Sequence, residues 1–120
     1  MSKIIFQSSE HQILFEKQGF IVLNFLNEQE LAELNQIFEE LHPDLTKSGF
    51  YSGSYSTDKN YKKKASDEIV RVFSRSYEKY FKDYTPFGGA FLFKVPGENS
   101  HLSIHQDWTI VDEEVNVALN

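Results

Sequence analysis

Residues 90–113, AFLFKVPGENSHLSIHQDWTIVDE, decide the fold class that the sequence predicts. Aromatic and β-branched residues are dense over 88–95 and again over 100–111, and such runs favour β-strands. The Pro-Gly pair at 96–97 separates the two runs and favours a turn. Residues 115–120 then alternate apolar and polar side chains, which is typical of a further strand. The last part of the chain is therefore expected to be β-structure.

Helices are expected before this β-region. Residues 28–41 carry apolar side chains at helical spacing. A short helix is expected over 9–18, where Gly19 is suited to end it, and a third helix is expected to begin at Ser66. Ser9 and Asn27 each stand three residues before a Gln or Glu, as in the capping boxes that begin helices. The expected order is therefore helices first and a run of strands afterwards.

The remaining segments complete an α+β chain. Residues 20–26, FIVLNFL, are β-branched and aromatic and predict a strand between the first two helices. Residues 42–65 are rich in Ser, Gly, Tyr and Lys without a clear period, and they indicate a long loop that could contact a substrate. We expect one domain over 1–120, with helices and a strand in 1–86 and the main strands in 87–120.

The composition excludes several classes of protein. The 120 residues are 40% hydrophobic and 25% charged, as in globular domains, and the net charge of -6 argues against binding nucleic acid or anionic membranes. The sequence has no cysteine, so neither disulfides nor thiolate metal sites can form. It has no apolar run of membrane-spanning length and no secretory leader at its start, which predicts a cytoplasmic protein.

His105 and Asp107 are the residues most suited to bind a metal. On a strand, residues two apart point to the same side with Cα atoms roughly 6.6 Å apart, so an imidazole and a carboxylate could converge on one ion. They would supply two corners of a 2-His-1-carboxylate facial triad. His101 is too distant, at roughly 13 Å along a strand. The alternative is an ordinary His–Asp hydrogen bond on a half-buried strand.

Two blocks of sequence resemble the phytanoyl-CoA dioxygenase family of Fe(II)/2-oxoglutarate-dependent oxygenases. They are FEKQGFIVLNFLNEQELAELNQIF (15–38) and the segment 90–113 with its HQDW. The resemblance implies a double-stranded β-helix, or jelly roll, with helices packed on one side. It implies Fe(II) bound by His105, Asp107 and a later His, and 2-oxoglutarate bound by the iron and a basic residue. It also implies O₂-dependent hydroxylation of a small-molecule substrate.

Lys94 is the basic residue that we assign to the anionic cosubstrate, against the alternative of a solvated lysine on a strand. The run Lys62–Lys64 could likewise contact a phosphorylated or CoA-linked substrate, although charge runs usually form a solvated surface.

The sequence departs from the family after Asp107, where it has no His, Arg or Lys. The later His and the basic residue of the family are therefore missing, and the jelly roll is expected to be incomplete, as in a truncated gene product or a fragment. A second hypothesis is a non-catalytic interaction module that forms a homo-oligomer through its unfinished last strand. A third is a cupin-like module that uses the same two ligands for a structural metal.

Overall fold

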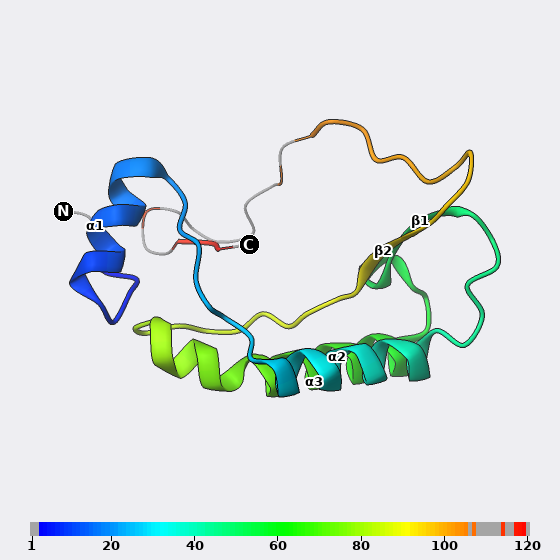
Figure 1. The fold of residues 1–120 in the computed structure, drawn as a ribbon, viewed down its shortest axis with the longest axis horizontal. Helices are drawn as coiled ribbons and strands as arrows, with labels where there is room; N and C mark the ends of the chain where they lie inside the picture. The colour runs from blue at the N-terminus through cyan, green and yellow to red at the C-terminus, as the bar shows by residue number, and fades with distance from the viewer. Residues whose placement is uncertain (1–2, 106, 108–113, 115–116, 120) are drawn as a thin grey trace.

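The fold is a computed structural model that describes residues 3–105, 107, 114 and 117–119 (Figure 1). Within these residues, three α-helices accompany one two-stranded antiparallel sheet, which confirms the α+β class. The elements, in chain order, are α1 (Ser9–Gln18), α2 (Glu28–Leu41), β1 (Gly49–Ser52), the 3₁₀ turn η1 (Gly53–Tyr55), α3 (Lys59–Tyr80) and β2 (Leu92–Val95).

The first helix has the predicted bounds but a different cap. Ser8, one residue before the expected Ser9, is the N-cap, and its hydroxyl oxygen accepts a hydrogen bond from the His11 amide at 3.4 Å. The side chain of Gln12 turns back instead, where its Oε1 accepts from the amide of Ile5 at 2.9 Å. At the other end Gly19 takes a φ of 78°, the left-handed conformation that commonly ends a helix.

The second helix confirms both the predicted bounds and the predicted capping box. The Asn27 side chain accepts from the Glu30 amide at 2.8 Å, and the Glu30 carboxylate accepts from the Asn27 amide at 2.9 Å. The helix lies along α3 and buries Ile37 at the contact. Arg71 and Arg75 of α3 reach across to acidic residues of α2, so charged pairs flank the apolar seam.

The third helix begins at Lys59, seven residues earlier than the sequence predicted. Asp58 is its N-cap, with Oδ1 accepting from the amides of Asn60 (2.9 Å) and Tyr61 (3.1 Å). The prediction of a loop over 42–65 was therefore wrong, because this stretch holds β1, η1 and the first turns of α3. The helix buries one continuous stripe, which consists of Ala65, Ile69, Val72, Ser76 and Tyr80.

Residues 20–26 are not a β-strand, which corrects the prediction. The segment links α1 to α2 (Figure 1), and side chains of α3 donate hydrogen bonds to its carbonyl groups. The Tyr80 hydroxyl donates to the Asn24 carbonyl at 2.9 Å, and Ser76 donates to the carbonyl of Phe25. These bonds satisfy backbone acceptors that a sheet partner would otherwise satisfy.

The small sheet pairs two strands that lie on either side of α3 in the sequence. β1 and β2 are antiparallel, with Gly49 opposite Val95 and Ser52 opposite Leu92. Only Leu92–Val95 of the predicted strand 88–95 belongs to the sheet. The residues before it lie against α3 instead, where the Gly89 amide donates to the Ser66 hydroxyl at 3.2 Å.

The structure describes only part of the strands that the sequence predicts over 100–111 and 115–120. Residues 100–105, 107 and 117–119 have no strand pairing, so the prediction fails over this part. The rest of these two segments, which is residues 106, 108–111, 115–116 and 120, lies outside the described residues, and Trp108 is among them.

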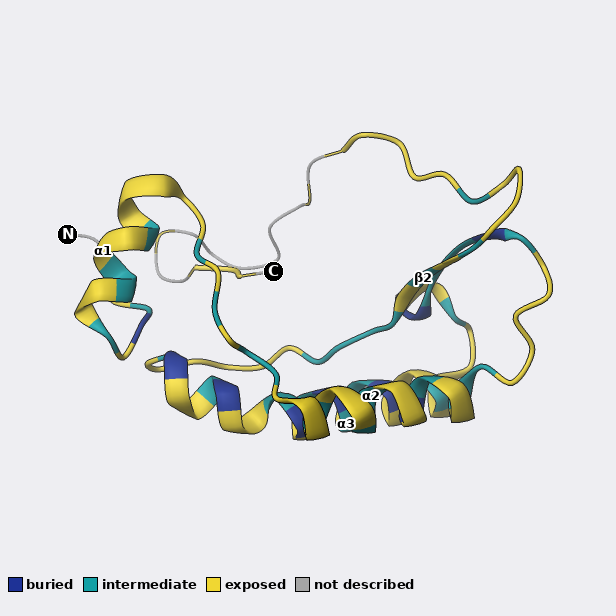
Figure 2. Ribbon diagram, in the orientation of Figure 1, coloured by how far each residue is buried: buried dark blue, intermediate teal, exposed yellow. Residues whose placement is uncertain are grey.

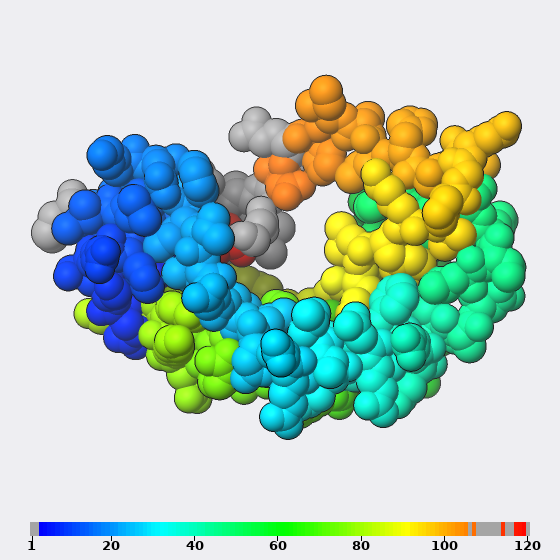
Figure 3. All heavy atoms as spheres, in the orientation of Figure 1, coloured from blue at the N-terminus to red at the C-terminus, as the bar shows by residue number. Residues whose placement is uncertain are grey.

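The molecule is open rather than compact. Its radius of gyration is 16.5 Å, whereas a compact chain of this length has about 13.6 Å. The accessible surface of 9532 Å² likewise exceeds the roughly 6,700 Å² expected of a compact monomer of this mass. Figure 3 shows a gap between the N-terminal part of the chain, in blue, and the segment that follows β2, in yellow and orange. Figure 2 shows that many of the buried residues lie along α3.

Candidate functional site

His105 and Asp107 lie side by side, as the sequence predicted, although neither belongs to a strand. The distance from His105 Nε2 to Asp107 Oδ1 is 3.2 Å. Both side chains are accessible, with 50% of the His105 side chain and 63% of the Asp107 side chain exposed. The pair can therefore be reached from solvent by an ion or a small molecule.

The hydrogen bond at Nδ1 of His105 fixes the tautomer of the ring, and so decides whether Nε2 can act as a metal ligand. Nδ1 lies 2.9 Å from the carbonyl oxygen of Ser103, which can only accept a hydrogen bond. Nδ1 must therefore carry a proton, and in the neutral ring Nε2 has a lone pair directed at Asp107. At 3.2 Å the two atoms are close enough to share a proton in an ordinary His–Asp hydrogen bond, or to bind one metal ion together.

The other residues considered for this site lie elsewhere or remain untested. In the described part of the chain, no group of three or more His, Asp and Glu side chains is placed to hold a metal ion. Lys94 lies on β2 opposite Phe50 with its side chain exposed, so its assignment to a cosubstrate stays a prediction. His101 is exposed as well.

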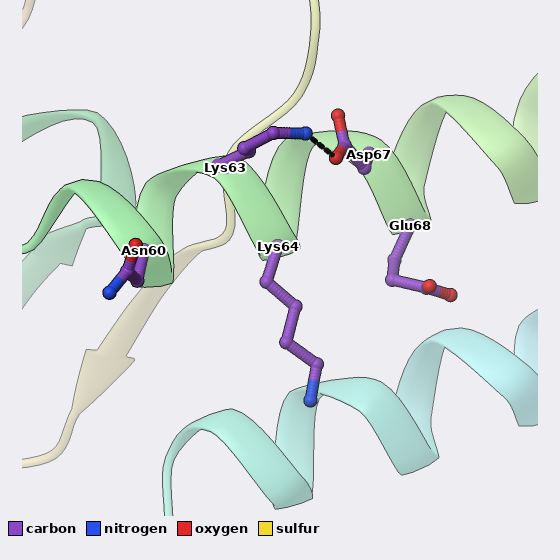
Figure 4. A pocket seen from close by; sticks show the side chains of 5 residues that line it. All are labelled: Asn60, Lys63, Lys64, Asp67 and Glu68. Atoms are coloured by element: carbon purple, nitrogen blue, oxygen red, sulfur yellow. Dashed lines mark hydrogen bonds and ion pairs between the residues drawn. The ribbon is translucent and has the colours of Figure 1, made fainter.

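The lysine run lies on the first turns of α3, not in a loop. Lys63 and Lys64 line a shallow hollow on the helix surface, of about 250 Å³, together with Asn60, Asp67 and Glu68 (Figure 4). Lys63 forms an ion pair with Asp67, whereas Lys64 points toward α2. Because this hollow carries two carboxylates beside the two ammonium groups, it does not present the uniformly positive surface that a phosphorylated substrate would need.

A histidine that the sequence did not single out is held tightly at the end of α2. His42 Nδ1 donates to the Phe38 carbonyl at 2.7 Å, and its Nε2 lies 2.7 Å from the Tyr61 hydroxyl. The rings of Phe91 and Phe93 pack against it at centroid distances of 5.8 and 4.7 Å. Burial raises the pKa of Tyr61, so its hydroxyl stays protonated and can donate to the imidazole.

This contact could not be found from sequence spacing, since His42 and Tyr61 are joined only by packing between α2 and α3. Nothing in the sequence next to His42 indicates a partner 19 residues away.

No helix in the part of the chain that the structure describes is both long enough and apolar enough to cross a lipid bilayer. The comparisons with known proteins found no match to this chain among protein-family models, curated proteins or solved structures.

Proposed function

We propose that this chain is part of an Fe(II)- and 2-oxoglutarate-dependent oxygenase of the phytanoyl-CoA dioxygenase type, acting on a small molecule in the cytoplasm. The observation that carries the proposal is the approach of His105 Nε2 to Asp107 Oδ1 at 3.2 Å. The resemblance of 15–38 and 90–113 to that family supports it. In this proposal the complete domain is a jelly roll, and α2 and α3 are the helices packed on its outside.

The spacing of the two donor atoms fits one metal ion. Two ligands with bonds near 2.1 Å, set at a right angle as in octahedral coordination, have donor atoms about 3.0 Å apart. The observed 3.2 Å agrees with this value. An imidazole nitrogen with a carboxylate oxygen is also the donor set that non-haem iron sites use.

The chain's own groups would orient these ligands. The bond from His105 Nδ1 to the Ser103 carbonyl fixes the ring and the tautomer, which is the usual outer support of a metal-bound histidine. Bound Fe(II) would supply open positions for 2-oxoglutarate and O₂, and thereby the oxidation of a C–H bond. Lys94, with its exposed ammonium group, would bind the far carboxylate of 2-oxoglutarate.

The proposal is tested by anaerobic titration of the chain with Fe(II) and 2-oxoglutarate, monitored by the charge-transfer absorption of the complex. We expect a saturable band that is lost in His105→Ala and in Asp107→Asn. His101→Ala is the matched control, because it removes an exposed histidine four residues earlier and should keep the band. Absence of the band from a folded chain, or its persistence in His105→Ala, would refute the proposal.

A second candidate is an interaction module, and the open surface favours it. Large apolar side chains are exposed beside the His–Asp pair, among them Leu102 (46%) and Ile104 (105%), and Val117 and Leu119 (42% each) are exposed near the end of the chain. Exposed apolar groups that form one large patch mark interaction surfaces. Association through this segment would give a homo-oligomer in sedimentation velocity runs, and Ile104→Ser should return it to a monomer. A wild-type chain that stays monomeric at high concentration would exclude this function.

A further inference from the structure

A second hollow, unconnected with His105 and Asp107, lies where β1, η1 and the start of α3 meet. Its volume is about 500 Å³, within the range of small-molecule sites. It is lined by the phenyl and phenol rings of Phe50, Tyr51, Tyr55, Tyr61 and Phe93, together with the imidazole of His42. We call this hollow, defined by these rings, the tyrosine pocket.

The aromatic walls of the tyrosine pocket are held in place by contacts behind them. The ring of Tyr51 stacks on Phe93 across the β1–β2 pairing, at a centroid distance of 5.1 Å, and its hydroxyl donates to the Lys47 carbonyl at 2.8 Å. Tyr61 is fixed by its hydrogen bond to His42. The pocket thus has preformed walls, which lowers the entropic cost of binding a ligand.

Close approach of the backbone also shapes this pocket. A Cβ atom on Gly53 would lie 3.0 Å from the Tyr61 hydroxyl, and the Gly53 amide donates to the Phe91 carbonyl at 2.9 Å. The glycine therefore lets η1 sit directly against the tyrosine. Tyr55 follows on the same turn and leaves 83% of its surface exposed, so its ring stands free beside the pocket.

The charge of the lining selects the ligand. Asp58 is the only charged side chain among the residues that line the pocket, and no Lys or Arg accompanies it. Its capping bonds both use Oδ1, which leaves Oδ2 without a hydrogen bond to any residue that the structure describes. Aromatic faces attract cations, and one carboxylate beside them strengthens that preference while disfavouring anions.

We propose that the tyrosine pocket binds a small organic cation that carries an aromatic ring, such as an arylalkyl ammonium ion. The ring stacks against the exposed tyrosines, and the ammonium group lies near Asp58 Oδ2. This site is additional to the proposed iron site and does not depend on it, because it shares no residue with it.

The test uses phenethylammonium as the probe and the ring-proton NMR signals of the tyrosines as the readout. We expect saturable shifts of the Tyr55 and Tyr61 signals. Hydrocinnamate, which replaces the ammonium group by a carboxylate, should bind more weakly. Butylammonium, which lacks the ring, should also bind more weakly. Tyr55→Ala should weaken phenethylammonium binding roughly two- to fivefold, the range of an exposed cation–π contact.

The variant Asp58→Asn removes the negative charge of the side chain and keeps its function as the N-cap of α3. Asparagine caps a helix as well as aspartate does, so α3 should stay intact while the charge is lost, and binding should weaken by about fivefold. Glu78→Gln is the matched control, since it removes an exposed carboxylate at the far end of α3 and should change nothing. The proposal is overturned by equal binding of hydrocinnamate, by unchanged binding in Asp58→Asn, or by no saturable shift in the folded chain.

Discussion

Gly89 allows the segment that leads into β2 to lie directly on α3, and replacing it by alanine tests this packing. A Cβ atom at position 89 would lie 2.5 Å from Cγ2 and 2.8 Å from Cβ of Ile69. Ordinary contacts between carbon atoms begin near 3.5 Å, so the overlap is about 1 Å. Because Ile69 Cβ is attached to the helix backbone, rotation of the side chain cannot remove the clash.

The expected cost of Gly89→Ala follows from two opposing effects. Inserting a methyl group into a packed contact costs about 1–3 kcal/mol, through shifts of the backbone and of neighbouring side chains. The same change restricts the unfolded chain and returns about 0.4–1 kcal/mol. We therefore expect a net destabilisation of about 1–2 kcal/mol.

Urea unfolding followed by far-UV circular dichroism measures this change as a shift of the midpoint at constant slope. A double-mutant cycle with Ile69→Ala makes the test specific, because the smaller side chain removes the nearest atom, Cγ2. The cost of the double variant should then fall short of the sum of the single costs by more than about 0.5 kcal/mol. Additive costs, or a single variant as stable as the wild type, would refute the reasoning.

Three further predictions concern polar contacts of α2 and α3. The hydrogen bond from Arg75 is the main cause that lowers the pKa of Glu30 from 4.5 to about 2, so the ionised carboxylate stabilises the fold above about pH 4.5. That stability should be lost as the pH falls toward 2, and urea midpoints measured across this range should show a weaker dependence in Glu30→Gln. Tyr61→Phe removes the hydrogen bond to His42 and should cost about 1 kcal/mol in the same assay. Asp58→Ala removes the N-cap of α3 and should cost about 1 kcal/mol, seen also as a loss of helical circular dichroism.

Two of these predictions have a matched control variant. Tyr55→Phe removes a tyrosine hydroxyl from an exposed ring and should change stability by less than about 0.5 kcal/mol. Asp58→Asn should retain most of the capping stability. The prediction for Tyr61 fails if Tyr55→Phe and Tyr61→Phe lose equal stability. The prediction for Asp58 fails if Asp58→Ala is as stable as Asp58→Asn. The prediction for Glu30 fails if Glu30→Gln loses stability in acid as the wild type does.

Local signals in the sequence predicted those features that depend on interactions between residues close together in the chain. Asn27 and Glu30 satisfy each other's backbone amides within one turn, so their spacing alone predicted the start of α2. Gly19 ends α1 for the same kind of reason, through its own backbone conformation. His105 and Asp107 also lie close together, but not for the expected reason, because neither belongs to a strand. Their role as metal ligands stays a prediction.

Long-range packing decided the features that the sequence did not reveal. The strand-like composition of 20–26 did not produce a strand, because side chains of α3 bind its carbonyls in place of a neighbouring strand. The early start of α3 was missed because Asp58 lies in a polar stretch that resembles a loop. The tyrosine pocket combines β1, η1, α3 and β2, so no window of sequence contains it.

The pairing of β1 with β2 has a consequence for synthesis of the protein. All of α3 lies between the two strands, so β1 leaves the ribosome about 40 residues before the partner that it needs. At roughly 5–20 residues per second, β1 waits about 2–8 s with both edges unpaired. Both helices of the pair α2–α3 end by Tyr80, so they can form and meet during that interval. The order of translation therefore favours a helical pair that is already formed when β2 arrives to close the sheet beside it.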